Sequence, residues 1–156
     1  MKLIEQLKFE EGCRLEAYIC PAGKKTIGYG HNLQSNPYGP DGWKIPDTIT
    51  QEVAEELLAI DVGTTIAALR KAWPRIDELD KARRDAFINM AYQLGVNGFM
   101  RFERLRAAAL ARDWETAAKE ALHSHWAKQT ENRAKRVAWQ IKFGKYYEVP
   151  NHEMGN

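Results

Sequence analysis

The chain has 156 residues, a length that suits one folded domain able to bury a core without disulfides or metals. Apolar residues make up 44% and charged residues 28%, which excludes a disordered chain, and no apolar run reaches the roughly 18 residues of a membrane-spanning helix. The net charge is only +2, but six cations and one acid give residues 128–145 a local charge of +5. Such a segment suits a polyanion, either nucleic acid or an acidic cell-wall polymer, or simple exposure to solvent.

The N-terminal residues predict a short first helix. Leu3 and Leu7 share one apolar face, and Gly12 can end the helix. Glu10 and Glu11 therefore fall in its last turn, where the helix dipole disfavours carboxylates, so their position needs another reason. The charges at this end leave no apolar core for a signal peptide, so we expect the chain to stay in the cytoplasm where it is made.

Residues 14–45 predict a small sheet of hairpins. The short runs LEAYI and KKTIGYG have a β-type composition, and glycine and proline separate them. Cys13 and Cys20 are seven residues apart, which matches no zinc spacing, so we expect reduced thiols and no metal or other cofactor. We expect Cys13 to be a small buried apolar residue.

The rest of the chain predicts helices. Thr50 suits the N-cap of an amphipathic helix over about 51–72, which would be roughly 33 Å long and closes before Pro74. The text KARRDAFINMAYQLG predicts a buried helix that ends at Gly95. Further helices are expected over 101–112, after Asp113, and from a cap at Thr130 to a stop near Gly144.

These elements predict an α+β fold in a single domain, residues 1–156. A small β-hairpin lobe covers about 13–49, and the long helix over about 51–72 connects it to a larger helical lobe. That lobe covers about 73–150 and includes the first helix, 1–12. A ligand site is expected at the cleft edge where the first helix meets the hairpin.

Three parts of the sequence carry a family resemblance: FEEGCRLEAY with TIGYGH, then INMAYQLG, then HWAKQTENRAKRV. They occur in the same order as in the T-even phage lysozymes, the phage-type muramidases or endolysins, which this chain resembles over nearly its whole length. The resemblance implies a lysozyme-like fold. It also implies hydrolysis of the β-1,4 bond between N-acetylmuramic acid and N-acetylglucosamine in bacterial peptidoglycan.

The resemblance also implies roles for individual residues. Glu11 matches the catalytic glutamate and Thr26 the catalytic-site threonine, while Cys20 stands where many members have aspartate. Arg133 matches an arginine beside the glutamate, where it would orient the carboxyl; the alternative is a solvated helical arginine. His31 matches a structural ion-pair residue, with Asp61 as its partner, rather than a second general base.

Three further positions are candidates for binding or supporting the substrate. Tyr92 and Gln93 match cleft-lining positions in the family, and we expect Trp126 to pack near them. Core packing is the alternative for all three residues.

The chemistry of glycoside cleavage agrees with Glu11. The leaving oxygen needs a proton, which a carboxylic acid can supply. A second group must act on the opposite face of the sugar, and the resemblance implies Cys20, which stands at the family's aspartate position, as base, nucleophile or positioner of water. The plain alternative is a half-buried thiol packed in the hairpin.

The sequence therefore predicts a monomeric endolysin that binds peptidoglycan, without nucleic acid or stable membrane insertion. We expect it to reach the periplasm and the cell wall from the host cytoplasm once a separate protein permeabilises the membrane. Two alternatives stay open. One is a lytic transglycosylase, which needs one acid and no activated water; the other is a non-catalytic module that binds cell wall or nucleic acid.

Overall fold

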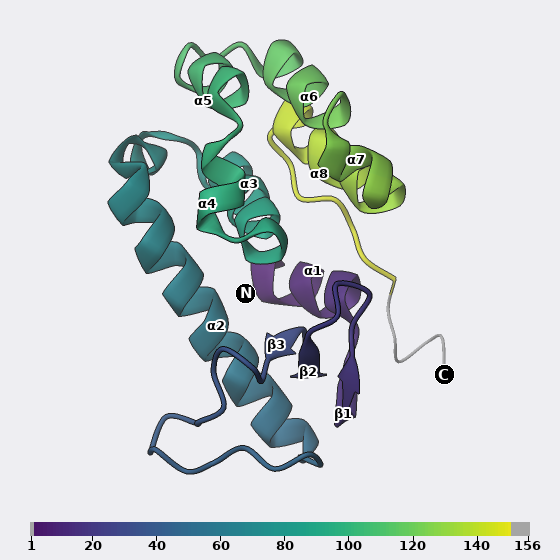
Figure 1. Ribbon diagram of the computed structural model, residues 1–156. Coiled ribbons are helices and arrows are strands. Elements are labelled where there is room, and N and C mark those ends of the chain that lie inside the picture. Colours follow the sequence, from purple (N-terminus) through teal and green to yellow (C-terminus); the bar gives the residue numbers. More distant parts are fainter. Residues whose placement is uncertain (1, 151–156) are drawn as a thin grey trace. The chain divides into compact units, whose positions relative to one another are not determined.

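A computed structural model describes residues 2–150 of the protein (Figure 1). Its packing divides these residues into two compact units, residues 2–64 with Pro150 and residues 65–149, and the boundary falls inside the long helix α2. Within the described part of the chain, no helix combines the length and apolar character needed to cross a membrane. A small antiparallel sheet together with many helices confirms the predicted α+β fold.

The first unit contains the helix α1 (Lys2–Glu11) and a three-stranded sheet of β1 (Arg14–Ile19), β2 (Lys25–Gly28) and β3 (His31–Asn32). Both neighbouring pairs are antiparallel, and Tyr18 pairs with Thr26, which in turn pairs with Asn32. Gly12 ends α1 with a φ of +66°, a conformation that glycine adopts without strain. The predicted first helix and hairpins are therefore confirmed.

The helix α2 (Gln51–Ala72) has the predicted bounds. The Thr50 hydroxyl accepts a hydrogen bond from the Val53 N–H at 3.2 Å, as expected of an N-cap. Its apolar stripe is buried at Leu57, Leu58, Val62 and Leu69, each at most 3% exposed. The stripe follows the helical period because burial requires one continuous face.

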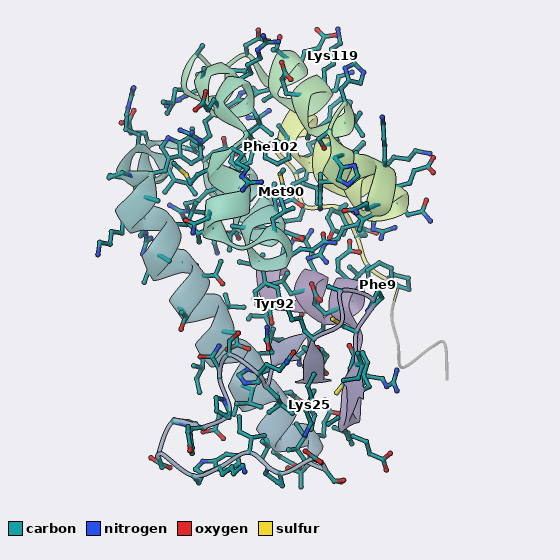
Figure 2. The ribbon with its side chains drawn as sticks, viewed as in Figure 1. Phe9, Lys25, Met90, Tyr92, Phe102 and Lys119 are labelled. Carbon is teal, nitrogen blue, oxygen red and sulfur yellow. The ribbon has the colours of Figure 1, made fainter. Side chains whose placement is uncertain are left out.

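The second unit is helical. Its elements are η1 (Pro74–Glu78), α3 (Lys81–Leu94), α4 (Val96–Met100), α5 (Glu103–Leu110), α6 (Trp114–Leu122), α7 (His125–Gln129) and α8 (Glu131–Phe143). Three aromatic rings form its centre, with Phe87 5.8 Å from Trp73 and 5.9 Å from Phe99 between centroids. Met90 and Phe102 lie among the same helices (Figure 2).

The helix α8 packs against α3, α6 and α7 (Figure 1). Arg83 of α3 secures its C-terminal end: Nε donates to the Ile141 carbonyl at 2.6 Å and Nη2 to the Lys142 carbonyl at 2.9 Å. The same guanidinium lies 4.2 Å from the centroid of the Trp114 ring. A cation on carbonyls that lack helical partners is favourable because these carbonyls carry the negative end of the helix dipole.

Three expectations from the sequence need correction. The helix expected over 101–112 begins at Glu103, after a separate short helix α4. Thr130 stands at the N-cap of α8, but its hydroxyl donates to the Trp126 carbonyl at 3.0 Å and caps no N–H. Cys13 is exposed rather than buried.

Candidate active site

Glu11 is the last residue of α1, and its carboxyl lies directly against Gly30. A Cβ added to Gly30 would come within 2.7 Å of the Glu11 Oε1 atom and 3.3 Å of Cδ. Gly30 lies in the turn between β2 and β3 and has a φ of +75°. The turn therefore needs glycine for two reasons, its backbone conformation and the space that the carboxyl occupies.

Cys20 and Thr26 are linked through one residue of the β1–β2 turn. The Cys20 N–H and the Thr26 hydroxyl both donate to the Lys24 carbonyl, each at 2.9 Å. Hydrogen bonding, chiefly from the Lys24 N–H, lowers the pKa of the Cys20 thiol. Cys20 is partly exposed and Thr26 is buried, so the turn presents a thiol with increased thiolate character beside a fixed hydroxyl.

Tyr18 of β1 is a further ionisable residue of the first unit. Burial raises the pKa of its hydroxyl, the Arg14 cation opposes this, and the negative charges of Cys20 and Glu11 raise the pKa further. The Arg14 guanidinium lies 4.3 Å from the Tyr18 ring centroid.

His31 and Asp61 form the expected ion pair. The His31 ring is 4% exposed; its Nδ1 lies 2.7 Å from Asp61 Oδ2 and its Nε2 lies 2.8 Å from the Asn36 carbonyl. Burial alone would lower the pKa of His31, but the hydrogen bond and charge of Asp61, with the Asn36 carbonyl, outweigh burial and raise it. Since both ring nitrogens face acceptors, these contacts favour the imidazolium form, which can donate to both. His31 follows Gly30 directly, so this pair anchors the turn under Glu11.

Arg133 lies in the second unit and is only 7% exposed, so the alternative of a solvated arginine is wrong. Its Nε and Nη2 donate to the Asn89 side-chain oxygen at 3.1 and 2.9 Å. The Asn89 amide nitrogen donates to the Tyr147 hydroxyl at 3.1 Å. The guanidinium is thus fixed by a hydrogen-bonded network, while its action on Glu11 stays a prediction.

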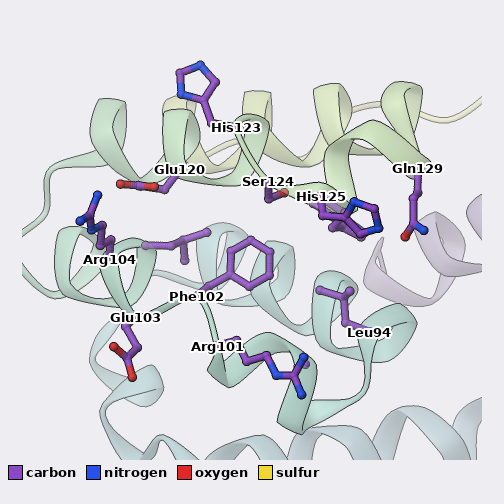
Figure 3. Close-up of a pocket in the computed structure, with 13 residues that line it drawn as sticks. Leu94, Arg101, Phe102, Glu103, Arg104, Glu120, His123, Ser124, His125 and Gln129 are labelled. Atoms are coloured by element: carbon purple, nitrogen blue, oxygen red, sulfur yellow. The ribbon is translucent and has the colours of Figure 1, made fainter.

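A pocket of about 530 Å³ opens in the second unit (Figure 3). The Phe102 ring projects into it, with Leu94 and Arg101 on one side and Ser124 and His125 on the other (Figure 3). Trp126 also lines the pocket, and its Nε1 donates to the Gln93 side-chain oxygen at 2.8 Å. Trp126 therefore packs beside Gln93, as expected; Tyr92 is half-buried, and a role for it in binding substrate stays a prediction.

The structure thus gathers Glu11, Cys20, Thr26 and His31 in the first unit, and Gln93, Trp126 and Arg133 in the second. Among residues 2–150, no three histidine, cysteine or acidic side chains group as ligands for a metal ion. Neither Tyr18 nor Gly30 was predicted from the sequence as a residue of the site. Tyr18 could have been found because it stands in β1 two residues before Cys20, which follows the end of that strand.

An α+β chain with a glutamate at the end of its first helix, resting on a small antiparallel sheet, defines a lysozyme-like protein. The chain belongs to the phage lysozyme family, whose model matches residues 8–138. This confirms the resemblance found in the sequence and makes the protein a lysozyme-like glycan hydrolase.

Several relatives are similar over most of the chain. The pre-baseplate central spike protein Gp5 of Enterobacteria phage T4 is 34% identical over 161 residues, covering 92% of this chain but only 28% of the spike protein. Probable T4-type lysozyme 1 of Dictyostelium discoideum is 30% identical over 160 residues, covering 90% of this chain and 93% of the relative. An endolysin of Acyrthosiphon pisum secondary endosymbiont phage 1 is 36% identical over 93 residues, covering 60% of this chain and 57% of the endolysin.

Proposed function

We propose that the protein hydrolyses the β-1,4 bond between N-acetylmuramic acid and N-acetylglucosamine in bacterial peptidoglycan. The observation that carries this proposal is the Glu11 carboxyl at the end of α1, which lies against the Gly30 turn of the same unit in which the Lys24 carbonyl joins Cys20 to Thr26. Glycoside cleavage needs an acid and a second group that acts on the opposite face of the sugar. Relatives named lysozyme and endolysin support the same substrate class.

In this reaction Glu11 gives its proton to the glycosidic oxygen as the bond to the anomeric carbon breaks. The Cys20 thiolate then takes a proton from the water that attacks that carbon, or attacks the carbon itself before water releases the sugar. Thr26 holds the water with its hydroxyl. It has one proton, which it gives to the Lys24 carbonyl in the structure, so its oxygen is left to accept from that water.

The products decide between hydrolysis and transglycosylation. Purified peptidoglycan digested by the protein should yield reducing muramic ends, whereas 1,6-anhydro ends would identify a lytic transglycosylase and overturn the proposal. Glu11→Gln should lower the rate by roughly 10² to 10⁴-fold with little loss of stability, because it keeps the size of a half-buried side chain and removes only the proton donor. A folded Glu11→Gln protein with wild-type turnover would exclude Glu11 as the acid.

The role of Cys20 has its own test. Cys20→Asp should keep substantial activity because a carboxylate can also serve as base or nucleophile, whereas Cys20→Ala should lose most of it. A thiol-blocking reagent should inhibit the wild type and spare Cys20→Asp. Full activity of Cys20→Ala would show that the thiol only packs in the hairpin.

We further propose that the protein is a monomeric endolysin, made in the host cytoplasm and admitted to the wall by a separate permeabilising protein. The similarity to a phage endolysin supports this setting. Bacteria that express the chain should stay intact until a membrane-permeabilising protein is also made, and should then lyse. Lysis without that second protein would refute this route.

A further inference from the structure

Two large aromatic side chains stand in solvent on α8. Trp139 is 43% exposed and Phe143 is 52% exposed, and their ring centroids are 5.4 Å apart. Five other aromatic residues of the second unit are at most 7% exposed, namely Trp73, Phe87, Phe99, Trp126 and Tyr147, and four are half-buried, namely Tyr92, Phe102, Trp114 and Tyr146. The exposed pair therefore contrasts with the buried aromatic core, and exposed aromatic residues of this kind often mark a binding surface.

The position of the pair on the helix supports this view. The buried face of α8 contains Ala134, Val137, Ala138 and Ile141, whereas Trp139 and Phe143 are one turn apart on the opposite face. Exposed lysines flank them at positions 135, 142 and 145. This outer face of α8 carries two aromatic rings between cations and does not pack into the core. Smaller polar residues at these positions would serve the fold equally well.

A hollow of about 490 Å³ lies beside the pair, lined by Trp139, Lys145, Tyr146, Tyr147 and Glu148. Two of its walls are held by hydrogen bonds. The Tyr146 hydroxyl donates to Asp85 Oδ2 at 2.6 Å, and the Tyr147 hydroxyl accepts from the Asn89 side chain. The hollow is therefore formed before any ligand arrives, which reduces the entropy that binding would lose.

The chemistry of the hollow suits a sugar ring. The apolar face of a pyranose can pack flat on an aromatic ring, while its hydroxyls find a donor in Lys145 and an acceptor in Glu148. A bilayer of anionic lipids fits less well, because the Glu148 carboxylate would repel the headgroups and a hollow cannot insert into them. The flanking lysines also suit the carboxylates of the peptides that peptidoglycan carries.

We propose that Trp139, Phe143 and the adjoining hollow form a glycan platform, a second surface that holds a peptidoglycan strand apart from the reacting residues. The identity of this polymer rests on the proposed function. The platform would lengthen the time that the protein stays on an insoluble wall. It also gives the basic segment 128–145 a partner, namely the acidic wall polymer.

The test measures binding without turnover. In a Glu11→Gln background, which leaves the polymer intact, the protein is sedimented with purified insoluble peptidoglycan and its dissociation constant is determined. Replacing both Trp139 and Phe143 by Gln, a good helix former, should weaken binding about tenfold, the scale expected when well-packed aromatic contacts are lost. Tyr38→Ala is the matched control, because this aromatic residue is 61% exposed and lies in the first unit; it should bind like its parent.

Thermal unfolding of the double variant, expected to match its parent, shows that a loss of binding is not a loss of fold. Unchanged peptidoglycan binding by the folded double variant would overturn the proposal. If that variant had also lost binding to anionic phosphatidylglycerol vesicles, the surface would be a membrane contact instead. A wild type that neither binds nor cleaves peptidoglycan would instead refute the proposed function. A wild type that cleaves it while the double variant binds normally would refute the platform alone.

Discussion

Replacing Gly30 by alanine should separate the positioning of Glu11 from the stability of the fold. The new Cβ would lie 2.7 Å from Glu11 Oε1, so the carboxyl must retreat to the ordinary contact distance of at least 3.4 Å. A catalytic group displaced on the ångström scale can lose roughly 10²-fold in rate. The residue must also keep a φ of +75°, which costs an L-residue about 1–2 kcal/mol.

Gly42→Ala provides the matched control for backbone strain. Gly42 also has a φ of +75°, but an added Cβ meets no atom of the described residues within 4 Å, its neighbours in the chain aside. Both variants should therefore lose about 1–2 kcal/mol in urea unfolding, while only Gly30→Ala should also lose roughly 10²-fold in the release of reducing ends from peptidoglycan. If Gly30→Ala retains the activity of Gly42→Ala, the carboxyl on this turn is not the reacting group, or its position is not critical.

Three other predictions follow from the same geometry. Iodoacetamide near neutral pH should alkylate Cys20 before Cys13, since hydrogen bonds lower the pKa of the Cys20 thiol whereas partial desolvation of the thiol raises the pKa of Cys13, although that residue is exposed as a whole; peptide mass spectrometry with equal rates at both sites would contradict this. The raised pKa of His31 means that its stabilising contribution is complete below its ordinary pKa of about 6.5 and is lost as pH rises through the folded-state value. Asp61→Asn should abolish that pH dependence and cost about 3 kcal/mol, the low end for a buried pair because Asp61 is 22% exposed; additive losses in a His31–Asp61 double-mutant cycle would rule the pair out. Finally, clearing of a peptidoglycan suspension should slow as salt rises from about 50 to about 300 mM, because exposed charges are screened beyond about 8 Å at physiological ionic strength. A rate that does not change with salt would mean that residues 128–145 are simply exposed to solvent and do not bind the polymer.

Long helices were predictable from the sequence because their signals are redundant. The helix α2 carries a cap at Thr50, an apolar stripe and a proline after its end, so its bounds Gln51–Ala72 agree with the prediction. The short helices α4 and α7 have five residues each, too few for a period to appear. The expected cap at Thr130 was wrong because a threonine hydroxyl can equally well donate back to the preceding turn, as it does to the Trp126 carbonyl.

Some residues of the candidate site were likewise predictable from the sequence and others were not. Glu11, Cys20 and Thr26 were found through the family motif, and the partner of His31 followed from the same resemblance. The contact of Gly30 with Glu11 was not predictable, because a glycine in a TIGYGH turn indicates only a backbone conformation and not the neighbour that occupies its missing side chain. The burial of Arg133 was also not apparent, because a cation in a charged helix is usually solvated.

The bond from Arg83 to the end of α8 has a consequence for how this helix holds together. The two carbonyls that it caps, on Ile141 and Lys142, belong to residues 58 and 59 positions further along the chain. A peptide cut from α8 would lack this long-range cap and should fray from its C-terminal turn, which lies beside Phe143. In native-state hydrogen exchange, the last amides of α8 should therefore open together with the first turn of α3, as one cooperative unit. The glycan platform on α8 would then keep its shape only while these amides stay hydrogen-bonded.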